Sequence, residues 1–62
     1  MAAYEFRYFI ASSDEPVGER IVLQSDGAAR ARAAAELLRL PGRRGVDVWS
    51  DGRLVYTHRR WP

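Results

Sequence analysis

The chain has 62 residues, with ten arginines, no lysine, eight carboxylates and a formal net charge of +2. This length predicts a single domain, residues 1–62, with a small core, because such a chain buries only about 60% of its unfolded surface. With no cysteine and one histidine, the sequence excludes disulfides, thiolate zinc sites and histidine-cluster metal sites. We therefore expect no metal and no cofactor, and we expect a partner surface to supply additional stability. The alternative is a monomer that is stable enough without a partner, as many domains of this size are.

The beginning of the chain carries neither the basic segment nor the apolar segment of a secretory signal. No apolar run approaches the roughly 20 residues that a membrane-spanning helix needs. These two observations predict a cytoplasmic protein.

Residues 4–10 are rich in aromatic and β-branched side chains and predict a strand. Its alternate residues Tyr4, Phe6, Tyr8 and Ile10 share one face. Residues 14–18 contain proline and glycine and predict a turn, and residues 21–23 form the centre of a second strand. The expected pairs are Ser13 with Gly18, Ile10 with Ile21 and Tyr8 with Leu23, which place the large apolar residues of both strands on one face.

Residues 27–40 predict a helix, since this segment is rich in alanine, leucine and arginine. Ser25 or Asp26 is the expected N-cap, and Pro41-Gly42 ends the helix. The pattern is not cleanly amphipathic. One stripe contains Ala28, Ala31, Ala35 and Leu38, with Ala34 beside it, and the opposite side contains Ala33, Leu37 and Leu40. We expect the side that faces the sheet to be small, which allows close packing.

Residues 46–50 and 53–59 predict a second hairpin around Asp51-Gly52, with residues 43–45 as the loop before it. An Asp-Gly pair between two strands indicates a type I′ turn, which needs positive φ at both positions. The expected cross-strand pairs are Ser50 with Arg53, Trp49 with Leu54, Val48 with Val55 and Asp47 with Tyr56.

The expected fold class is α+β with a ββαββ order, in which one helix packs on one face of a four-stranded sheet. We predict the strand order 2-1-4-3 of the protein-G-like β-grasp, with the first and last strands parallel at the centre. The alternative is the all-antiparallel order 2-1-3-4.

Three segments resemble a group of short alphaproteobacterial proteins of unknown function. They are residues 6–10, the helix start Asp26-Gly27-Ala28-Ala29, and residues 46–53. The resemblance covers nearly the whole chain and implies a bacterial, cytoplasmic domain that forms oligomers. It implies no activity.

No constellation of residues predicts catalysis. The lone His58 has no serine and acid in a recognisable order around it, although Ser12, Ser13 and Ser50 lie beside turns. The acidic residues Asp14, Glu15 and Glu19 lack the alternating spacing of a calcium loop. The glycines form no phosphate-binding motif. We therefore expect a protein that is not an enzyme.

A single helix covers only one face of a sheet, so the other face stays open. If Val46, Val48 and Val55 point toward the helix, apolar residues remain on the open side and form a predicted interface, ringed by Arg7, Arg20 and His58. This interface consists of Phe9, Val22, Trp49, Leu54 and Tyr56. Exposed apolar patches mark interaction surfaces, and tryptophan, tyrosine and arginine are enriched at binding hot spots. We therefore expect a small interaction module that forms a homodimer, or binds a small protein partner, through its open sheet face.

The alternative function is binding of RNA or DNA. The residues that would carry it are Arg43, Arg44, Arg59, Arg60 and Trp61, which combine phosphate-binding groups with a ring that stacks on a base. The basic residues are spaced almost evenly and are offset by eight carboxylates. We therefore expect nucleic-acid binding to be weak.

Overall fold

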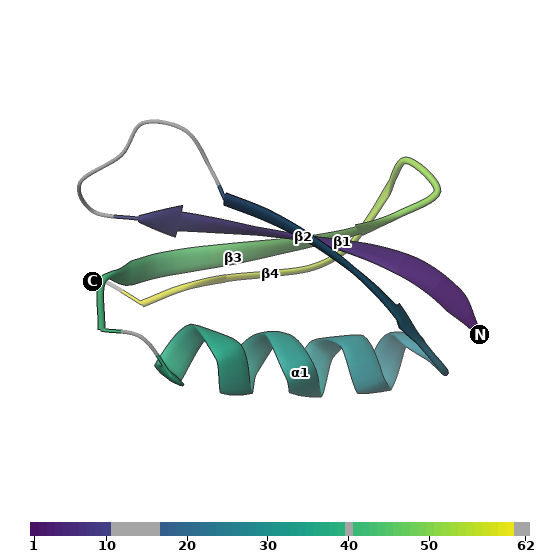
Figure 1. Ribbon diagram of the computed structural model, residues 1–62, viewed down its shortest axis with the longest axis horizontal. Helices are drawn as coiled ribbons and strands as arrows, with labels where there is room; N and C mark the ends of the chain where they lie inside the picture. Colours follow the sequence, from purple (N-terminus) through teal and green to yellow (C-terminus); the bar gives the residue numbers. More distant parts are fainter. Residues whose placement is uncertain (11–16, 40, 61–62) are drawn as a thin grey trace.

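The computed structural model describes residues 1–10, 17–39 and 41–60. Its elements are β1 (Ala2–Ile10), β2 (Val17–Leu23), α1 (Asp26–Arg39), β3 (Arg43–Ser50) and β4 (Arg53–Arg59). The helix lies under one face of a four-stranded sheet (Figure 1). This arrangement confirms the predicted α+β class and the ββαββ order.

The strand order is β2-β1-β3-β4, and every neighbouring pair is antiparallel. The predicted main order 2-1-4-3 is therefore wrong, and the antiparallel alternative is confirmed. The reason lies in the last two strands. β3 contributes the fully buried Val46 and Val48, whereas the end of β4 is polar and exposed. An edge position leaves Thr57, His58 and Arg59 in solvent, where a central position would bury them.

The first hairpin is paired six residues away from the predicted register. Tyr8 lies opposite Val17 and Tyr4 lies opposite Ile21, so the predicted pairs of Tyr8 and Ile10 are wrong. The predicted pair that involves Ser13 falls outside the described residues. Because a shift by an even number of residues leaves every side chain on its original face, the hydrophobic pattern fits both registers equally well.

The second hairpin confirms the predicted turn, since φ is 52° at Asp51 and 73° at Gly52. Trp49 lies opposite Leu54, as expected, but a bulge follows, and Val48 lies opposite Tyr56. The predicted pairs of Val48 and Asp47 are therefore wrong. A bulge inserts one extra residue into one strand and moves each later side chain of that strand to the other face. Tyr56 consequently points to the helix side.

We expect Gly52→Val to lower the free energy of unfolding by at least about 1 kcal/mol, because a β-branched residue is strained at positive φ. No atom lies within 4 Å of the position that a Cβ would take, so crowding contributes nothing. Urea denaturation followed by circular dichroism measures the effect. Gly52→Asn is the control, since asparagine tolerates this conformation. A valine variant as stable as the asparagine variant would contradict the type I′ turn.

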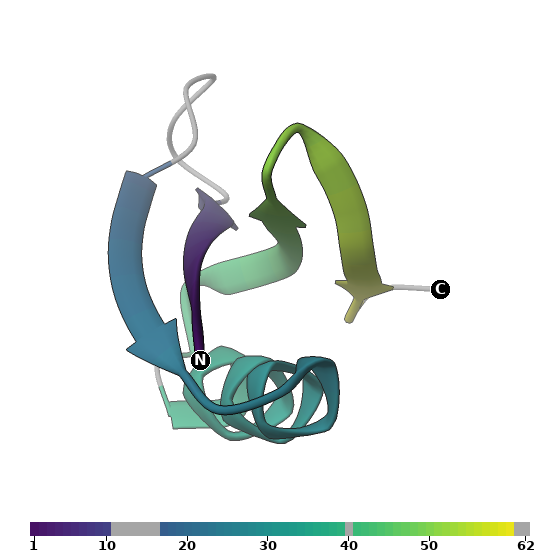
Figure 2. The same cartoon turned by 90° about the vertical axis from the view of Figure 1, so that its right-hand side faces the viewer.

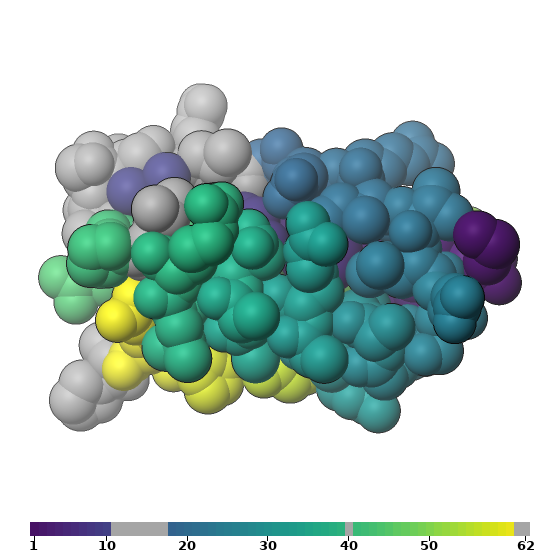
Figure 3. All heavy atoms as spheres, turned by 60° about the horizontal axis from the view of Figure 1, so that its bottom comes forward, coloured from purple at the N-terminus to yellow at the C-terminus, as the bar shows by residue number. Residues whose placement is uncertain are grey.

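The core lies between α1 and the two central strands. It consists of Tyr4, Phe6, Tyr8, Ala29, Ala33, Leu37, Val46 and Val48. The predicted inward position of the two valines of β3 is confirmed. The helix packs through Ala29, Ala33 and Leu37, which is the side that contains Ala33 and Leu37 in the predicted pattern. The other predicted stripe faces outward, since Ala31 and Ala35 are exposed and Leu38 is 70% exposed. Figure 3 shows this outer surface, with the helix in front of the sheet.

Both ends of α1 are capped by side chains. The Oγ atom of Ser25 accepts a hydrogen bond from the amide of Ala28 at 3.1 Å, which confirms Ser25 as the N-cap. At the other end, Arg43 donates to the carbonyl of Glu36 at 2.6 Å and Arg60 donates to the carbonyl of Leu37 at 3.3 Å. Cations at this end also complement the helix dipole. Among the described residues, no helix is long and apolar enough to cross a membrane.

Candidate interaction surface

The open face is the side of the sheet that points away from α1, and Figure 2 shows it uncovered above the helix. Strand alternation assigns the side chains to it. Its central strands contribute Glu5, Arg7, Phe9, Asp47 and Trp49, and its edge strands contribute Arg20, Val22, Leu54, Thr57 and Arg59. Charged and aromatic residues are therefore interleaved on this surface.

Arg7 covers the aromatic ring at the centre of the open face. Its guanidinium carbon lies 5.4 Å from the centroid of the Trp49 ring, and its Nη2 atom forms a 3.0 Å ion pair with Glu5. A cation over an aromatic face is attracted to it, by about 0.5–1 kcal/mol at an exposed site. The indole Nε1 of Trp49 is itself buried and finds no acceptor among the described residues.

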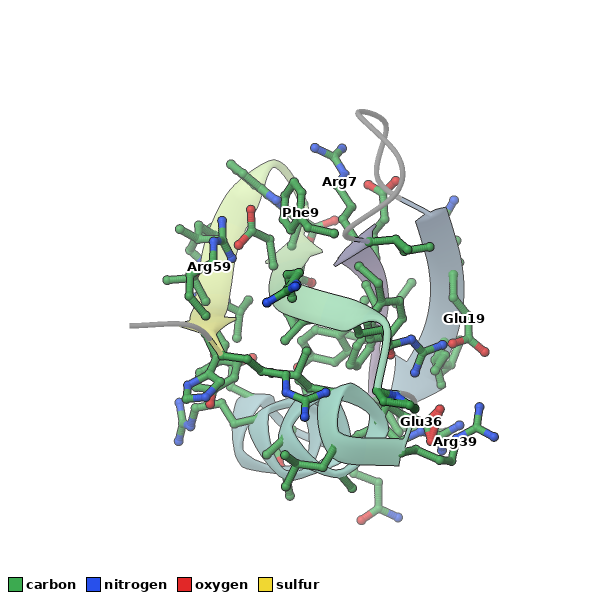
Figure 4. The ribbon with its side chains drawn as sticks, turned by 90° about the vertical axis from the view of Figure 1, so that its left-hand side faces the viewer. Arg7, Phe9, Glu19, Glu36, Arg39 and Arg59 are labelled. Carbon is green, nitrogen blue, oxygen red and sulfur yellow. The ribbon has the colours of Figure 1, made fainter. Side chains whose placement is uncertain are left out.

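Arg59 covers the second ring of the open face. Its guanidinium carbon lies 4.5 Å from the centroid of Phe9, and its Nη1 atom donates to Asp47 at 2.9 Å. Figure 4 shows Arg59 beside Phe9 on the side away from the helix. Thr57 donates to the same carboxylate at 2.7 Å. Burial raises the pKa of Asp47, but the hydrogen bonds from Arg59 and Thr57 outweigh this and hold its pKa below the ordinary value.

Gly45 makes room for this arrangement. A Cβ atom there would lie 2.7 Å from Cδ of Arg59 and 2.9 Å from the backbone oxygen of His58. Both separations are shorter than ordinary carbon contacts. Arg59 therefore crosses β3 over a residue that has no side chain. The predicted loop at 43–45 is wrong, since these residues begin β3.

A shallow groove of about 590 Å³ runs over β1, between β2 and the turn after β3. Its floor includes the small residues Ala3 and Gly18, and Trp49 lines it too. Its charged residues are Glu5, Arg7, Glu19, Arg20 and Asp51. The groove therefore offers charges of both signs around one aromatic ring.

The structure separates the residues of the predicted interface. Val22 is 59% exposed on β2 and Leu54 is 45% exposed on β4, at opposite edges of the open face, whereas the rings of Phe9 and Trp49 lie under arginines. Tyr56 lies on the helix side, because the bulge moves it there. His58 stacks on Tyr56 with a centroid distance of 6.3 Å, so it does not join Arg7 and Arg20 on the open face.

Three of the four arginines proposed for nucleic-acid binding make contacts within the fold. Arg43 lies 4.0 Å over the Tyr8 ring with its side chain 14% exposed, and Arg60 caps α1. Arg59 binds Asp47, as described above. Arg44 is exposed, and Trp61 lies outside the described residues. The backbones of the four arginines lie together at one end of β3 and β4, where the amide of Arg60 donates to the carbonyl of Arg44 at 2.8 Å.

A polar cluster that the sequence does not reveal joins β1, α1 and β4. The hydroxyl of Tyr4 donates to Asp26 at 2.7 Å, and Arg53 donates to the other carboxylate oxygen at 3.3 Å. The hydrogen bond from Tyr4 lowers the pKa of Asp26 and raises that of Tyr4. Because each charge has a partner within the fold, the cluster acts as a tether for the start of the helix.

Of the serines considered as nucleophiles, the structure describes only Ser50. Ser50 is buried, and its hydroxyl donates to the carbonyl of Ala3 at 3.0 Å. Ser12, Ser13, Asp14 and Glu15, also considered for catalysis or cation binding, lie outside the described part of the chain, whereas Glu19 is exposed on β2. Within that part, no three carboxylate or histidine side chains cluster as metal ligands would.

Comparison of the chain with models of known protein families, with curated proteins and with solved structures finds no match. Its function must therefore be argued from the open face itself.

Proposed function

We propose that this protein is a non-enzymatic interaction module that binds a second copy of itself through the open face. The observation that carries the proposal is the alternation of charge on the central strands. Arg7 follows Glu5 along the open face of β1, and Arg7 lies opposite Asp47 on β3. Neighbouring positions along and across the strands thus carry opposite signs. A two-fold axis can therefore place an arginine of each copy against a carboxylate of the other, as an isologous interface requires.

Apolar surface at the edges of the same face adds a hydrophobic contribution. Among the sheet residues whose side chains the structure describes, Val22 and Leu54 are the most exposed large apolar ones. Burial of apolar surface contributes about 25 cal/mol for each square ångström removed from water. Because Val22 and Leu54 lie at opposite edges of the open face, their apolar contacts would surround the charged residues of the central strands.

The size of the open face sets the expected strength of this association. Four strands about 4.8 Å apart, with about seven residues of about 3.3 Å each, outline on the order of 440 Å² per copy. The total of roughly 900 Å² lies below the standard interface of about 1,200–2,000 Å² and corresponds to a weak, reversible dimer. We therefore expect monomer and dimer to exchange at micromolar concentrations.

We expect wild-type mass from light scattering to rise toward that of a dimer between tens and hundreds of micromolar. Leu54→Glu should keep the protein monomeric over this range, because it places a charge in the contact. Leu38→Glu is the matched control, since Leu38 is an exposed leucine on the opposite side of the molecule, and it should leave the mass unchanged.

A wild-type protein that stays monomeric at hundreds of micromolar would contradict the proposal. Loss of the dimer in Leu38→Glu, with the dimer kept in Leu54→Glu, would move the interface to the outer face of α1.

For nucleic acid, we expect affinity no better than tens of micromolar for mixed-sequence single-stranded RNA or DNA at physiological salt, the range of non-specific binding. The open face carries carboxylates at its centre, and Arg43 and Arg60 are engaged with α1. Fluorescence anisotropy at two salt concentrations measures this affinity. Sub-micromolar binding that is lost in Arg44→Ala would instead favour a nucleic-acid-binding protein.

A further inference from the structure

β2 is one of the two edge strands of the sheet, and Figure 2 shows β2 at one side and β4 at the other. An edge strand presents a row of backbone N–H and C=O groups that no neighbouring strand pairs. We infer that the β2 edge binds an extended peptide segment of a partner protein, which adds to the sheet as a further strand. This site lies beside the open face and does not depend on the proposed self-association.

The hydrogen bonds of the central strands identify the residues of β2 that face outward. The N–H and C=O groups of one strand residue point to the same side, and successive residues alternate. Ser50 donates to the carbonyl of Ala3 at 3.0 Å, so Ala3 points toward β3 and the next residue, Tyr4, points toward β2. Ile21, the partner of Tyr4, therefore points toward β1. The β2 residues of the opposite phase point outward, and these are Gly18, Arg20 and Val22.

A backbone hydrogen bond at the other end of the sheet leads to the same assignment. The amide of Arg60 donates to the carbonyl of Arg44 at 2.8 Å, so Arg44 and the even-numbered residues after it in β3 point toward β4. Asp47 then points toward β1, and its partner Arg7 points toward β3. Because Arg7 and Ala3 have the same phase in β1, the two observations agree.

The β4 edge is less suited to a new strand. Its pairing with β3 is interrupted by a bulge between Val48 and Trp49, and bulges twist an edge away from a regular ladder. β2 contains no proline and pairs with β1 from Val17 to Leu23 without a shift in register. Of the two edges, β2 therefore offers the regular ladder that an added strand needs.

The side chains of β2 select the chemistry of the added segment. Arg20 is exposed, and Glu5, which lies opposite it on β1, forms its ion pair with Arg7. Among the described residues no carboxylate pairs with Arg20, so an acidic residue across from it completes a cross-strand ion pair. Val22 is 59% exposed and Ile21 is half-buried, so apolar residues fit opposite both. An antiparallel segment of two apolar residues followed by an acidic one matches this edge.

A second copy of β2 is a poorer occupant of the edge. A two-fold axis that pairs all three outward residues places Arg20 opposite Arg20 of the second copy, and like charges directly opposite each other are destabilising. A partner segment with a carboxylate at this position replaces the repulsion by attraction. The outward backbone groups lie at the side of the sheet, so they stay accessible in a pair formed through the open face.

A synthetic peptide tests the inference. The probe is fluorescein-Gly-Thr-Val-Ile-Glu-Lys-Thr-amide, whose glutamate lies opposite Arg20 when the strands are antiparallel. We expect fluorescence anisotropy to show saturable binding, and Arg20→Glu to raise the Kd about threefold to tenfold. Arg44→Glu is the matched control, because it makes the same change of charge at an exposed residue of β3 and should leave the Kd unchanged.

N-methylation of the probe distinguishes edge pairing from other modes of binding. The N–H of the probe glutamate points toward β2, because this residue lies opposite an outward-facing one, whereas the N–H of the probe isoleucine points away. We expect the N-methyl-glutamate probe to lose binding and the N-methyl-isoleucine probe to keep it. Equal binding of the two methylated probes would overturn the inference, and so would a parent probe that does not bind at millimolar concentration.

Val22→Pro makes the same test in the protein. Proline removes an N–H that points outward, so the variant should keep the circular dichroism spectrum of the fold and lose the probe. Val22→Thr keeps this N–H and should still bind.

Light scattering separates the inference from the proposed function. Probe binding by a strictly monomeric protein would contradict the proposed function and support this inference. A dimer with no probe binding would do the reverse. Loss of the dimer in Val22→Pro, but not in Val22→Thr, would identify a second copy as the occupant of the edge and overturn both.

Discussion

Leu37→Ala is expected to lower the free energy of unfolding by about 2–5 kcal/mol, the range for truncation of a buried leucine. Leu37 is 1% exposed and is the largest side chain that α1 places in the core, since the other two buried helix residues are alanines. Its removal leaves a cavity that two alanines cannot fill. In a domain of this size such a loss is a large part of the total stability. Urea denaturation monitored by circular dichroism measures it.

Leu38→Ala is the matched control, because it removes the same atoms from the next residue of the helix. Leu38 is 70% exposed, so its truncation should change the free energy of unfolding by no more than about 0.5 kcal/mol. Equal losses in the two variants would mean that α1 does not pack through Leu37.

Gly45→Ala is expected to cost about 1–3 kcal/mol, the usual range for overpacking. The added methyl group would overlap Cδ of Arg59 and the backbone oxygen of His58. The side chain of Arg59 can move away, but the backbone of β4 cannot do so without loss of its pairing with β3. We therefore expect Arg59→Ala to restore only part of the lost stability in a double variant, as urea denaturation would show.

Gly42→Ala is the control for this prediction, since no atom lies within 4 Å of the position of its Cβ. Removal of a flexible glycine there should be neutral or slightly stabilising. Equal stability of the Gly45→Ala and Gly42→Ala variants would show that Arg59 does not need the empty position in β3.

The sequence pattern predicts some of the residues of the open face but not the contacts between them. The sequence indicates that one sheet face stays uncovered and that Phe9, Trp49, Val22 and Leu54 contribute to it. It does not indicate that Arg7 and Arg59 lie over the two rings. These contacts join different strands, so they depend on register and on the bulge in β4. The same bulge removes Tyr56 from the face.

Local features were determined by the sequence alone. The Asp51-Gly52 turn, a helix cap at Ser25 or Asp26 and the shared face of Val46 and Val48 are each specified within a few neighbouring residues, whereas the choice of the face that meets the helix is not. Turn conformation, capping and strand alternation are short-range properties, so a sequence pattern is sufficient to predict them.

The register of the first hairpin and the order of the strands were decided only by the tertiary structure. An even shift in register preserves the face of Tyr4 and Tyr8, so hydrophobic alternation cannot distinguish the possible pairings. Both strand orders bury one sheet face under α1, and the difference lies in which strand occupies the edge. The polar end of β4 needs solvent on its outer side, and only the assembled sheet, with β3 against β1, provides it.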